Sequence, residues 1–238
     1  MQPMQPNQQA PLQHQLLDGV LTLTLNRPHK RNAINNELAR ALLAALQQAD
    51  TDAATRAVLL CGNGLAFCAG RDVSEPPTDA DLELTQQVAC ALVACRKPVV
   101  VAVHGWVVGA GLEWMLDADI VIAADNARFK LPEASLGVFV TGGISALLPA
   151  VVGLNRAKAL MLLGEEFSAG QAQAWGLVWK VVPADALPAT TLQTAKRLAA
   201  LDPTVVAHFK RVLNTVGAPG FAEAIQRETE VQRALMAR

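Results

Sequence analysis

The most diagnostic stretch of the chain reads PVVVAV (98–103) and continues as HGWVVGAGLE (104–113). Its first part is a continuous apolar run, which is typical of a strand covered on both faces. Its second part is rich in glycine and leads into an apolar helix that we expect over residues 110–118. A further apolar strand is expected at 119–124. Strand, helix and strand in succession indicate an α/β fold.

The same alternation extends outward from this stretch towards both ends of the chain. The segment VLTLTL alternates apolar and hydroxyl side chains, as a half-buried strand does. Other segments repeat apolar residues at helical spacing. The expected strands are residues 20–25 and 57–61, and the expected helices begin at Asn36 and cover about 79–95, much of 142–175 and 189–238.

Length and composition favour one globular unit. The 238 residues are 52% hydrophobic and 17% charged, so the chain can bury a sizeable core. The opening fifteen residues are polar and rich in Pro and Gln. We therefore expect a flexible arm over residues 1–14, an α/β core over 15–188 and a helical region over 189–238.

Charge and targeting signals exclude several classes of protein. A formal net charge of −1 gives no support for binding nucleic acid or a membrane surface. The N-terminal segment lacks the pattern of a secretion signal, and no apolar run reaches about 18 residues. Four cysteines without a C-x-x-C pair fit a reducing compartment, so we expect a cytoplasmic protein.

Small residues at Gly109, Ala110 and Gly111 stand where the strand gives way to the helix. They allow close approach and leave the first helical N–H groups unpaired, so these groups can hold a developing negative charge. A glycine-rich turn needed only for packing is the alternative. The chain has neither a dinucleotide-binding fingerprint nor a P-loop lysine.

Two glutamates are candidates for acid/base chemistry. Glu113 lies in an apolar helix without a basic residue three or four positions away, and Glu133 follows a proline in a loop. Alone, Glu113 could be a helix-terminal glutamate stabilised by the dipole, and Glu133 a solvated turn residue. Together they suit acid/base catalysis, because one low-dielectric site can push two pKa values apart. The four histidines lack metal-ligand spacing, so no metal is expected.

Five segments, in order, resemble the successive motifs of the enoyl-CoA hydratase/isomerase (crotonase) family. They are LNRP with NAI (25–34), AFCAGRD (66–72), Lys97-Pro98 through Glu113, LPEASLG (131–137) and SAGQA through WGLV (168–178). The resemblance implies a crotonase-like spiral of ββα repeats with two roughly perpendicular sheets. It also implies a C-terminal helical region that forms a homotrimer, commonly a dimer of trimers.

The resemblance also implies an acyl-CoA substrate and a role for each motif residue. Glu113 and Glu133 would hold a water and deliver its elements across the double bond. The backbone N–H groups of Ala69 and Ala110 would form the oxyanion hole. The implied contacts to coenzyme A are Lys30 and Arg31 at the phosphates and Ala69, Gly70, Arg71 and Asp72 along the adenine and pantetheine path. No separate cofactor is implied, since coenzyme A enters as part of the substrate.

The expected activity is therefore that of an enoyl-CoA hydratase. An isomerase, decarboxylase or hydrolase could use the same oxyanion hole, and a non-catalytic acyl-CoA-binding protein is the remaining alternative. Two departures from the family pattern bear on the acyl pocket. Residues 140–143 read VTGG, one residue shorter and without the proline of many hydratases, and Leu131 replaces a polar residue.

Overall fold

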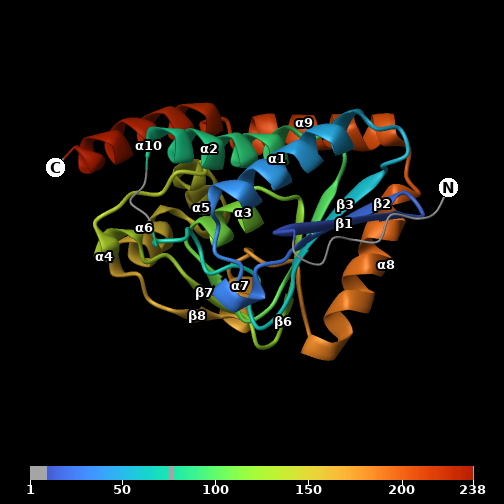
Figure 1. Ribbon diagram of the computed structural model, residues 1–238, viewed down its shortest axis with the longest axis horizontal. Coiled ribbons are helices and arrows are strands. Elements are labelled where there is room, and N and C mark those ends of the chain that lie inside the picture. The colour runs from blue at the N-terminus through green and yellow to red at the C-terminus, as the bar shows by residue number, and fades with distance from the viewer. Residues whose placement is uncertain (1–9, 75–77, 238) are drawn as a thin grey trace.

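The computed structural model describes residues 10–74 and 78–237. Two sheets form its framework (Figure 1). The six-stranded sheet has the order β1 (Leu12–Leu17), β2 (Val20–Leu25), β3 (Ala57–Gly62), β4 (Val99–Val103), β6 (Ile120–Ala124) and β9 (Lys180–Val182). The three-stranded sheet has the order β5 (Trp106–Val108), β7 (Arg128–Lys130) and β8 (Phe167–Ser168). All neighbours in the large sheet are parallel except β1 and β2.

Helices cover both faces of the large sheet. In Figure 1, α1, α2, α9 and α10 lie together on one side, and α8 lies on the other. The helices are α1 (Asn36–Thr51), α2 (Asp79–Ala94), α3 (Ala110–Leu116), α4 (Glu133–Leu136), α5 (Ile144–Val152), α6 (Leu154–Leu163), α7 (Ala169–Ala174), α8 (Leu187–Ala199), α9 (Pro203–Gly217) and α10 (Phe221–Met236). Short 3₁₀ turns occur at Pro28–Lys30 and Ala184–Ala186. No helix within the described ranges is both long and apolar enough to cross a bilayer.

The buried strands are the ones that the apolar patterns predict. The expected strands at 20–25, 57–61, 98–103 and 119–124 correspond to β2, β3, β4 and β6. Every residue of β4 is buried, because α8 covers one face of the sheet and the main core covers the other. The expected helices beginning at Asn36 and covering 79–95 and 110–118 are confirmed as α1, α2 and α3.

The N-terminal boundary differs from the expectation. We expected a flexible arm over residues 1–14, but residues 12–14 belong to β1, whose Leu12 is buried opposite Leu25 of β2. Most other side chains of β1 are exposed because the strand lies at the edge of the sheet. Its sequence therefore has the polar composition that suggested an arm. Residues 1–9 of that expected arm lie outside the described residues.

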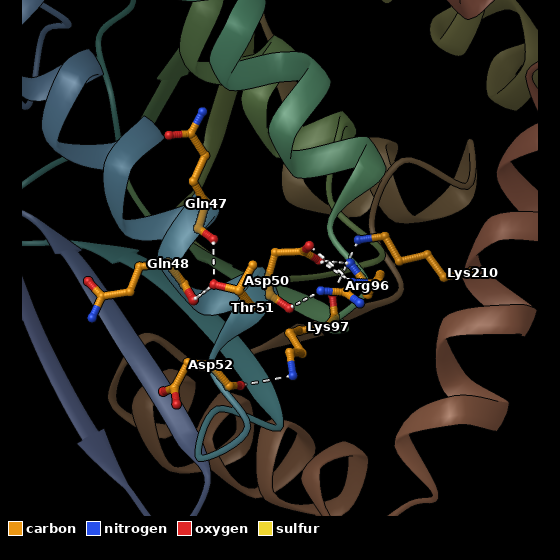
Figure 2. Close-up of polar contacts among 8 residues, drawn as sticks. All are labelled: Gln47, Gln48, Asp50, Thr51, Asp52, Arg96, Lys97 and Lys210. Carbon is orange, nitrogen blue, oxygen red and sulfur yellow. Dashed lines mark hydrogen bonds and ion pairs between the residues drawn. The ribbon is translucent and has the colours of Figure 1, made fainter.

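Polar contacts fasten the ends of the helices beside β4 (Figure 2). The Asp50 carboxylate at the end of α1 accepts from the Arg96 backbone N–H at 2.6 Å and forms an ion pair with its side chain at 3.0 Å. The buried Lys210 ammonium on α9 donates to the Leu92 carbonyl at 2.9 Å and lies 2.8 Å from the Asp119 carboxylate. These bonds attach α9 to the C-terminal end of α2 and to the start of β6.

Candidate active site

A cavity of about 520 Å³ opens beside the N-terminus of α3. Most of the residues singled out in the sequence line it, although they come from three separate segments. The loop after β3, the turn between β5 and α3, the loop that begins with α4, and α10 all contribute walls. The predicted residues that line the cavity are Ala69, Gly70, Arg71, Ala110, Glu113 and Glu133.

The turn before α3 presents free backbone donors to this cavity. The Gly109 carbonyl accepts the N–H groups of Leu112 and Glu113, which starts the helix. The N–H groups of Ala110 and Gly111 have no acceptor among the described residues. Gly109 has φ +51°, and a Cβ there would stand 2.5 Å from Glu133 Oε1. Glycine at 109 therefore lets the Glu133 carboxylate approach the same turn that carries the Ala110 donor.

The structure corrects the first predicted oxyanion donor. The Ala69 N–H donates to the Arg31 carbonyl at 3.0 Å, so it is not available to a ligand. The Arg71 N–H, two residues later, has no acceptor in the described part of the chain. Its neighbour Asp72 donates to the Ile34 carbonyl in a parallel bridge, and successive N–H groups of an extended chain point in opposite directions. Arg71 rather than Ala69 therefore presents its N–H towards the cavity, alongside Ala110.

Glu113 is held by backbone donors at the bottom of the cavity. Its side chain is buried, and Oε2 accepts the N–H of Thr141 at 3.0 Å and that of Gly142. Burial, followed by the nearby carboxylates of Glu133 and Glu228, raises the pKa of Glu113 well above its ordinary value. The protonated form of Glu113 is therefore favoured more strongly than in a solvated glutamate.

Glu133, the first residue of α4, faces Glu113 across the same space with fewer partners. Its Oε2 is buried and has no hydrogen-bond partner among the residues that the structure describes. Burial raises the pKa of Glu133 to about 7. The cavity thus contains two carboxyls whose pKa values are both raised, and acid/base catalysis requires one of such a pair to hold a proton while the other is ionised.

Lys30, Arg31 and Asp72 were also predicted to contact coenzyme A, and they do not line the cavity. Lys30 and Arg31 are exposed on the 3₁₀ turn after β2, and the Ala69–Arg31 hydrogen bond joins this turn to the cavity rim. Asp72 forms an ion pair with Arg27 at 3.0 Å, so its carboxylate supports the turn. The Arg71 side chain is paired with Asp81 of α2 at 2.8 Å.

Two acidic residues near Glu113 were not singled out in the sequence. Asp117, one helical turn after Glu113, is buried, and neither of its carboxyl oxygens has a hydrogen-bond partner in the described ranges. Glu228 is buried on α10 and accepts from Gly143 and Ser145. Of these two acids, only Glu228 has a weak sequence signal for burial, because its spacing places it on the same face of the helix as Ala224 and Gln232. That face is buried in the structure.

Comparison with known proteins gives one consistent result. Residues 16–238 match the family model described as enoyl-CoA hydratase/isomerase. The chain is 36% identical to the 1,2-epoxyphenylacetyl-CoA isomerase of Escherichia coli K12 over 90% of this chain and 86% of that protein. It is 40% identical to the 2,3-dehydroadipyl-CoA hydratase of the same strain over 82% and 78% of the two chains. A crystal structure of an enoyl-CoA hydratase from Mycobacterium avium subsp. paratuberculosis superimposes with a TM-score of 0.91 at 33% identity, covering 96% of this chain and 91% of that one.

Proposed function

Since the chain belongs to the enoyl-CoA hydratase/isomerase family, we propose that it adds water reversibly to the Cα=Cβ bond of a 2-enoyl-CoA thioester. The observation that carries this proposal is the pair of carboxyls, Glu113 and Glu133, which line one cavity beside two backbone N–H groups that have no acceptor among the described residues. Burial raises the pKa of both carboxyls, so that one can donate a proton while the other accepts one.

In this mechanism the backbone polarises the thioester. The carbonyl oxygen accepts from the N–H groups of Arg71 and Ala110, which stabilise the negative charge that develops as water adds to Cβ. A preorganised donor of this kind is worth roughly 3–4 kcal/mol in the transition state. Because backbone groups supply these bonds, glycine and alanine suit the surrounding positions better than large side chains.

The two carboxyls then divide the elements of water between the two carbons. The ionised carboxyl takes one proton from the water, and the water oxygen bonds to Cβ. The proton of the neutral carboxyl moves to Cα, where the electron pair of the double bond becomes available. The pair ends with one proton, as it began, and can act again after the two groups re-equilibrate.

Acyl-CoA is the proposed partner, and coenzyme A enters as part of the substrate. Lys30 and Arg31 are the proposed contacts to its phosphates, because both are exposed cations on a turn bonded to the cavity rim. The pantetheine arm would pass along Ala69, Gly70 and Arg71, which line the cavity. Asp72 would act indirectly, by holding Arg27 beneath the turn.

Double-bond isomerisation is the second candidate. Glu133 favours it, because its Oε2 has no partner among the described residues and could move a proton alone. The relative named 1,2-epoxyphenylacetyl-CoA isomerase shows that isomerases occur among the relatives of this chain, although its named substrate is an epoxide. The two reactions differ in their need for Glu113, because only hydration requires a second carboxyl to handle the water.

The test of the function is spectrophotometric. Wild-type protein is mixed with crotonyl-CoA and with a panel of longer and aromatic enoyl-CoAs, and the absorbance of the conjugated enoyl thioester is followed. Hydration predicts loss of that absorbance with formation of the 3-hydroxyacyl-CoA. Tight binding of acyl-CoA without turnover of any member of the panel would overturn the hydratase proposal.

We also propose a homotrimer, or a dimer of trimers, assembled in part through α9. Several apolar side chains are exposed on α9, including Phe209 at 65% and Val216 at 73%, and an exposed apolar face of this kind marks an interaction surface. Phe209→Asp is expected to shift the molar mass in multi-angle light scattering from a multiple of three chains towards the monomer. The matched control Gln193→Asp, on exposed α8 surface, should retain the wild-type mass. A monomeric wild type, or an assembly unaffected by Phe209→Asp, would contradict this interface.

The proposed location is the cytoplasm. All four cysteines are free thiols, and Cys68 and Cys95 are buried as small core side chains. Free thiols persist most readily in a reducing compartment, which supports this proposal.

A further inference from the structure

The last helix, α10, turns a partly polar face towards the protein interior. Ala224, Glu228 and Gln232 recur at intervals of four, so they share one side of the helix, and all three are buried. Glu228 is 1% exposed. A buried carboxylate is costly unless hydrogen bonds compensate its charge, so its contacts indicate what the face does.

Those contacts all go to one loop. Glu228 Oε2 accepts the N–H of Gly143 at 2.7 Å, and Oε1 accepts that of Ser145 at 2.9 Å. Gln232 Oε1 accepts the N–H of Phe139 at 2.7 Å. Gly143 precedes α5, which has no N-terminal cap from its own segment, so Glu228 supplies the capping acceptor from a different helix.

The same loop holds the carboxylate of Glu113. The N–H groups of Thr141 and Gly142 donate to Glu113 Oε2, and those of Gly143 and Ser145, next along the chain, donate to Glu228. The loop therefore lies between a carboxylate of α3 and a carboxylate of α10. A shift of Gly143 away from Glu228 would carry Thr141 and Gly142 with it and move the donors that orient Glu113.

We infer that Glu228 is a positioning residue for Glu113, acting through the backbone of residues 141–145. This inference rests on the proposed function, since it assigns Glu113 to the chemistry. Glu228 does not line the cavity and so is not a catalytic residue. Glu228 holds the N–H groups of Gly143 and Ser145, whereas Glu113 lines the cavity in which we propose that the substrate binds.

If Glu228 only capped α5, replacing it would change stability alone. Because Glu228 also raises the pKa of Glu113, replacing it should change that pKa as well. The titratable groups that raise the pKa of Glu113 are Glu133 on α4 and Glu228 on α10, and Glu113 in turn raises the pKa of Asp117 on its own helix; all are acids. Arg71, a cation that lines the cavity, is paired with Asp81. Burial raises the pKa of Glu228, and its bonds with Ser145 and Gly143 oppose that shift. In the pH range where Glu228 is ionised, removing its charge should lower the pKa at which Glu113 ionises.

The test compares Glu228→Gln with the wild type in kcat, KM and the pH profile for an enoyl-CoA that the wild type hydrates. Glutamine keeps the shape but can accept only through one oxygen, so Gly143 or Ser145 loses its acceptor. We expect kcat to fall by on the order of 10²-fold, as small misplacements of a catalytic group can cause, with little change in KM. The basic limb of the profile should also move to lower pH. The control Glu230→Gln makes the same change two residues away on the exposed face of α10 and should match the wild type.

Two outcomes would overturn the inference. One is a Glu228→Gln enzyme with wild-type kcat and pH profile. The other is a loss of activity that is equal at every pH and parallels a loss of melting temperature, since that indicates a structural role only.

A titration keeps the inference testable even if no enoyl-CoA is turned over and the proposed function fails. The protein is labelled with ¹³C at the glutamate carboxyls, and the Glu113 signal is assigned by its absence in Glu113→Gln. In Glu228→Gln this signal should titrate at lower pH than in the wild type. An unchanged titration would overturn the inference independently of turnover.

Discussion

Glu133→Gln is expected to lower kcat for hydration of a 2-enoyl-CoA by roughly 10²–10⁴-fold, the usual contribution of a positioned acid or base. Glutamine fills the same space beside Gly109 but can neither take up nor release the proton. KM should change much less, because the thioester is held by the backbone donors of Arg71 and Ala110. Steady-state kinetics with purified variants measure both constants.

Glu113→Gln serves as the comparison that separates the two candidate reactions. Hydration should fall as steeply as in Glu133→Gln, whereas double-bond isomerisation should persist if Glu133 alone moves the proton. The exposed Glu165→Gln is the matched control and should behave as wild type. Retention of more than a tenth of wild-type hydration by both cavity variants would show that these carboxyls are not the acid and base.

The pH profile of kcat/KM in the wild type should be bell-shaped. Activity requires one protonated and one ionised carboxyl in the pair. Because burial raises the pKa of Glu133 to about 7, and that of Glu113 well above its ordinary value, the rate should rise as pH increases through about 7. It should fall again when Glu113 ionises. A flat profile across this range would contradict the proposed division of roles.

Asp117→Asn is expected to stabilise the protein at alkaline pH by about 1.4 kcal/mol for each unit by which folding raises the pKa of Asp117. Asp117 is 4% exposed, and neither of its carboxyl oxygens has a partner among the described residues. It also ends α3, where the helix dipole disfavours negative charge. Burial, followed by Glu113 and Glu228, raises its pKa well above the ordinary value.

Because folding raises the pKa of Asp117, the free energy of unfolding depends on pH in a definite direction. The folded state holds a proton on Asp117 that the unfolded chain releases near its ordinary pKa of about 3.9. The stability that comes from a neutral Asp117 is therefore complete below that pKa and is lost as pH rises through the raised folded pKa. Asparagine carries no charge at any pH, so the variant avoids this loss.

Urea unfolding at about pH 5 and about pH 8 measures the effect. The stability of Asp117→Asn relative to the wild type should be greater at the higher pH than at the lower one. The exposed Asp125→Asn is the control and should not alter the pH dependence. A variant that is less stable than wild type by the same amount at both pH values would show that Asp117 has a hydrogen-bond partner after all.

The sequence predicts the large sheet because its inner strands are buried on both faces and therefore read as apolar runs. A second sheet was implied by the family resemblance, but the residue patterns did not identify its three strands. Its strands β5, β7 and β8 are two or three residues long, and β5 pairs with β7 twenty-two positions away. No local period marks strands this short. β1 was missed because an edge strand can have the polar composition of a loop.

The candidate site was predicted as far as its motifs extend. Glu113, Glu133 and Ala110 line one cavity as expected, whereas the Ala69 N–H is paired with Arg31 and the proposed first oxyanion donor is Arg71 instead. Which N–H of the segment faces the cavity depends on the bridge to Ile34, a contact between distant segments. Glu228 and Asp117 were not predicted because the fold buries them near Glu113, and burial of an individual acid is not encoded in its immediate neighbours.

The hydrogen bond from Ala69 to Arg31 has a consequence for how the protein distinguishes one thioester from another. Together with the bonds between Ile34 and residues 70 and 72, it makes the basic turn and the rim of the cavity one rigid body. On the proposed assignment of Lys30 and Arg31, the anchored nucleotide and the reacting carbonyl lie a fixed distance apart. The protein would then select thioesters by the length of the pantetheine arm, because only an arm that spans this distance places the carbonyl at the backbone donors.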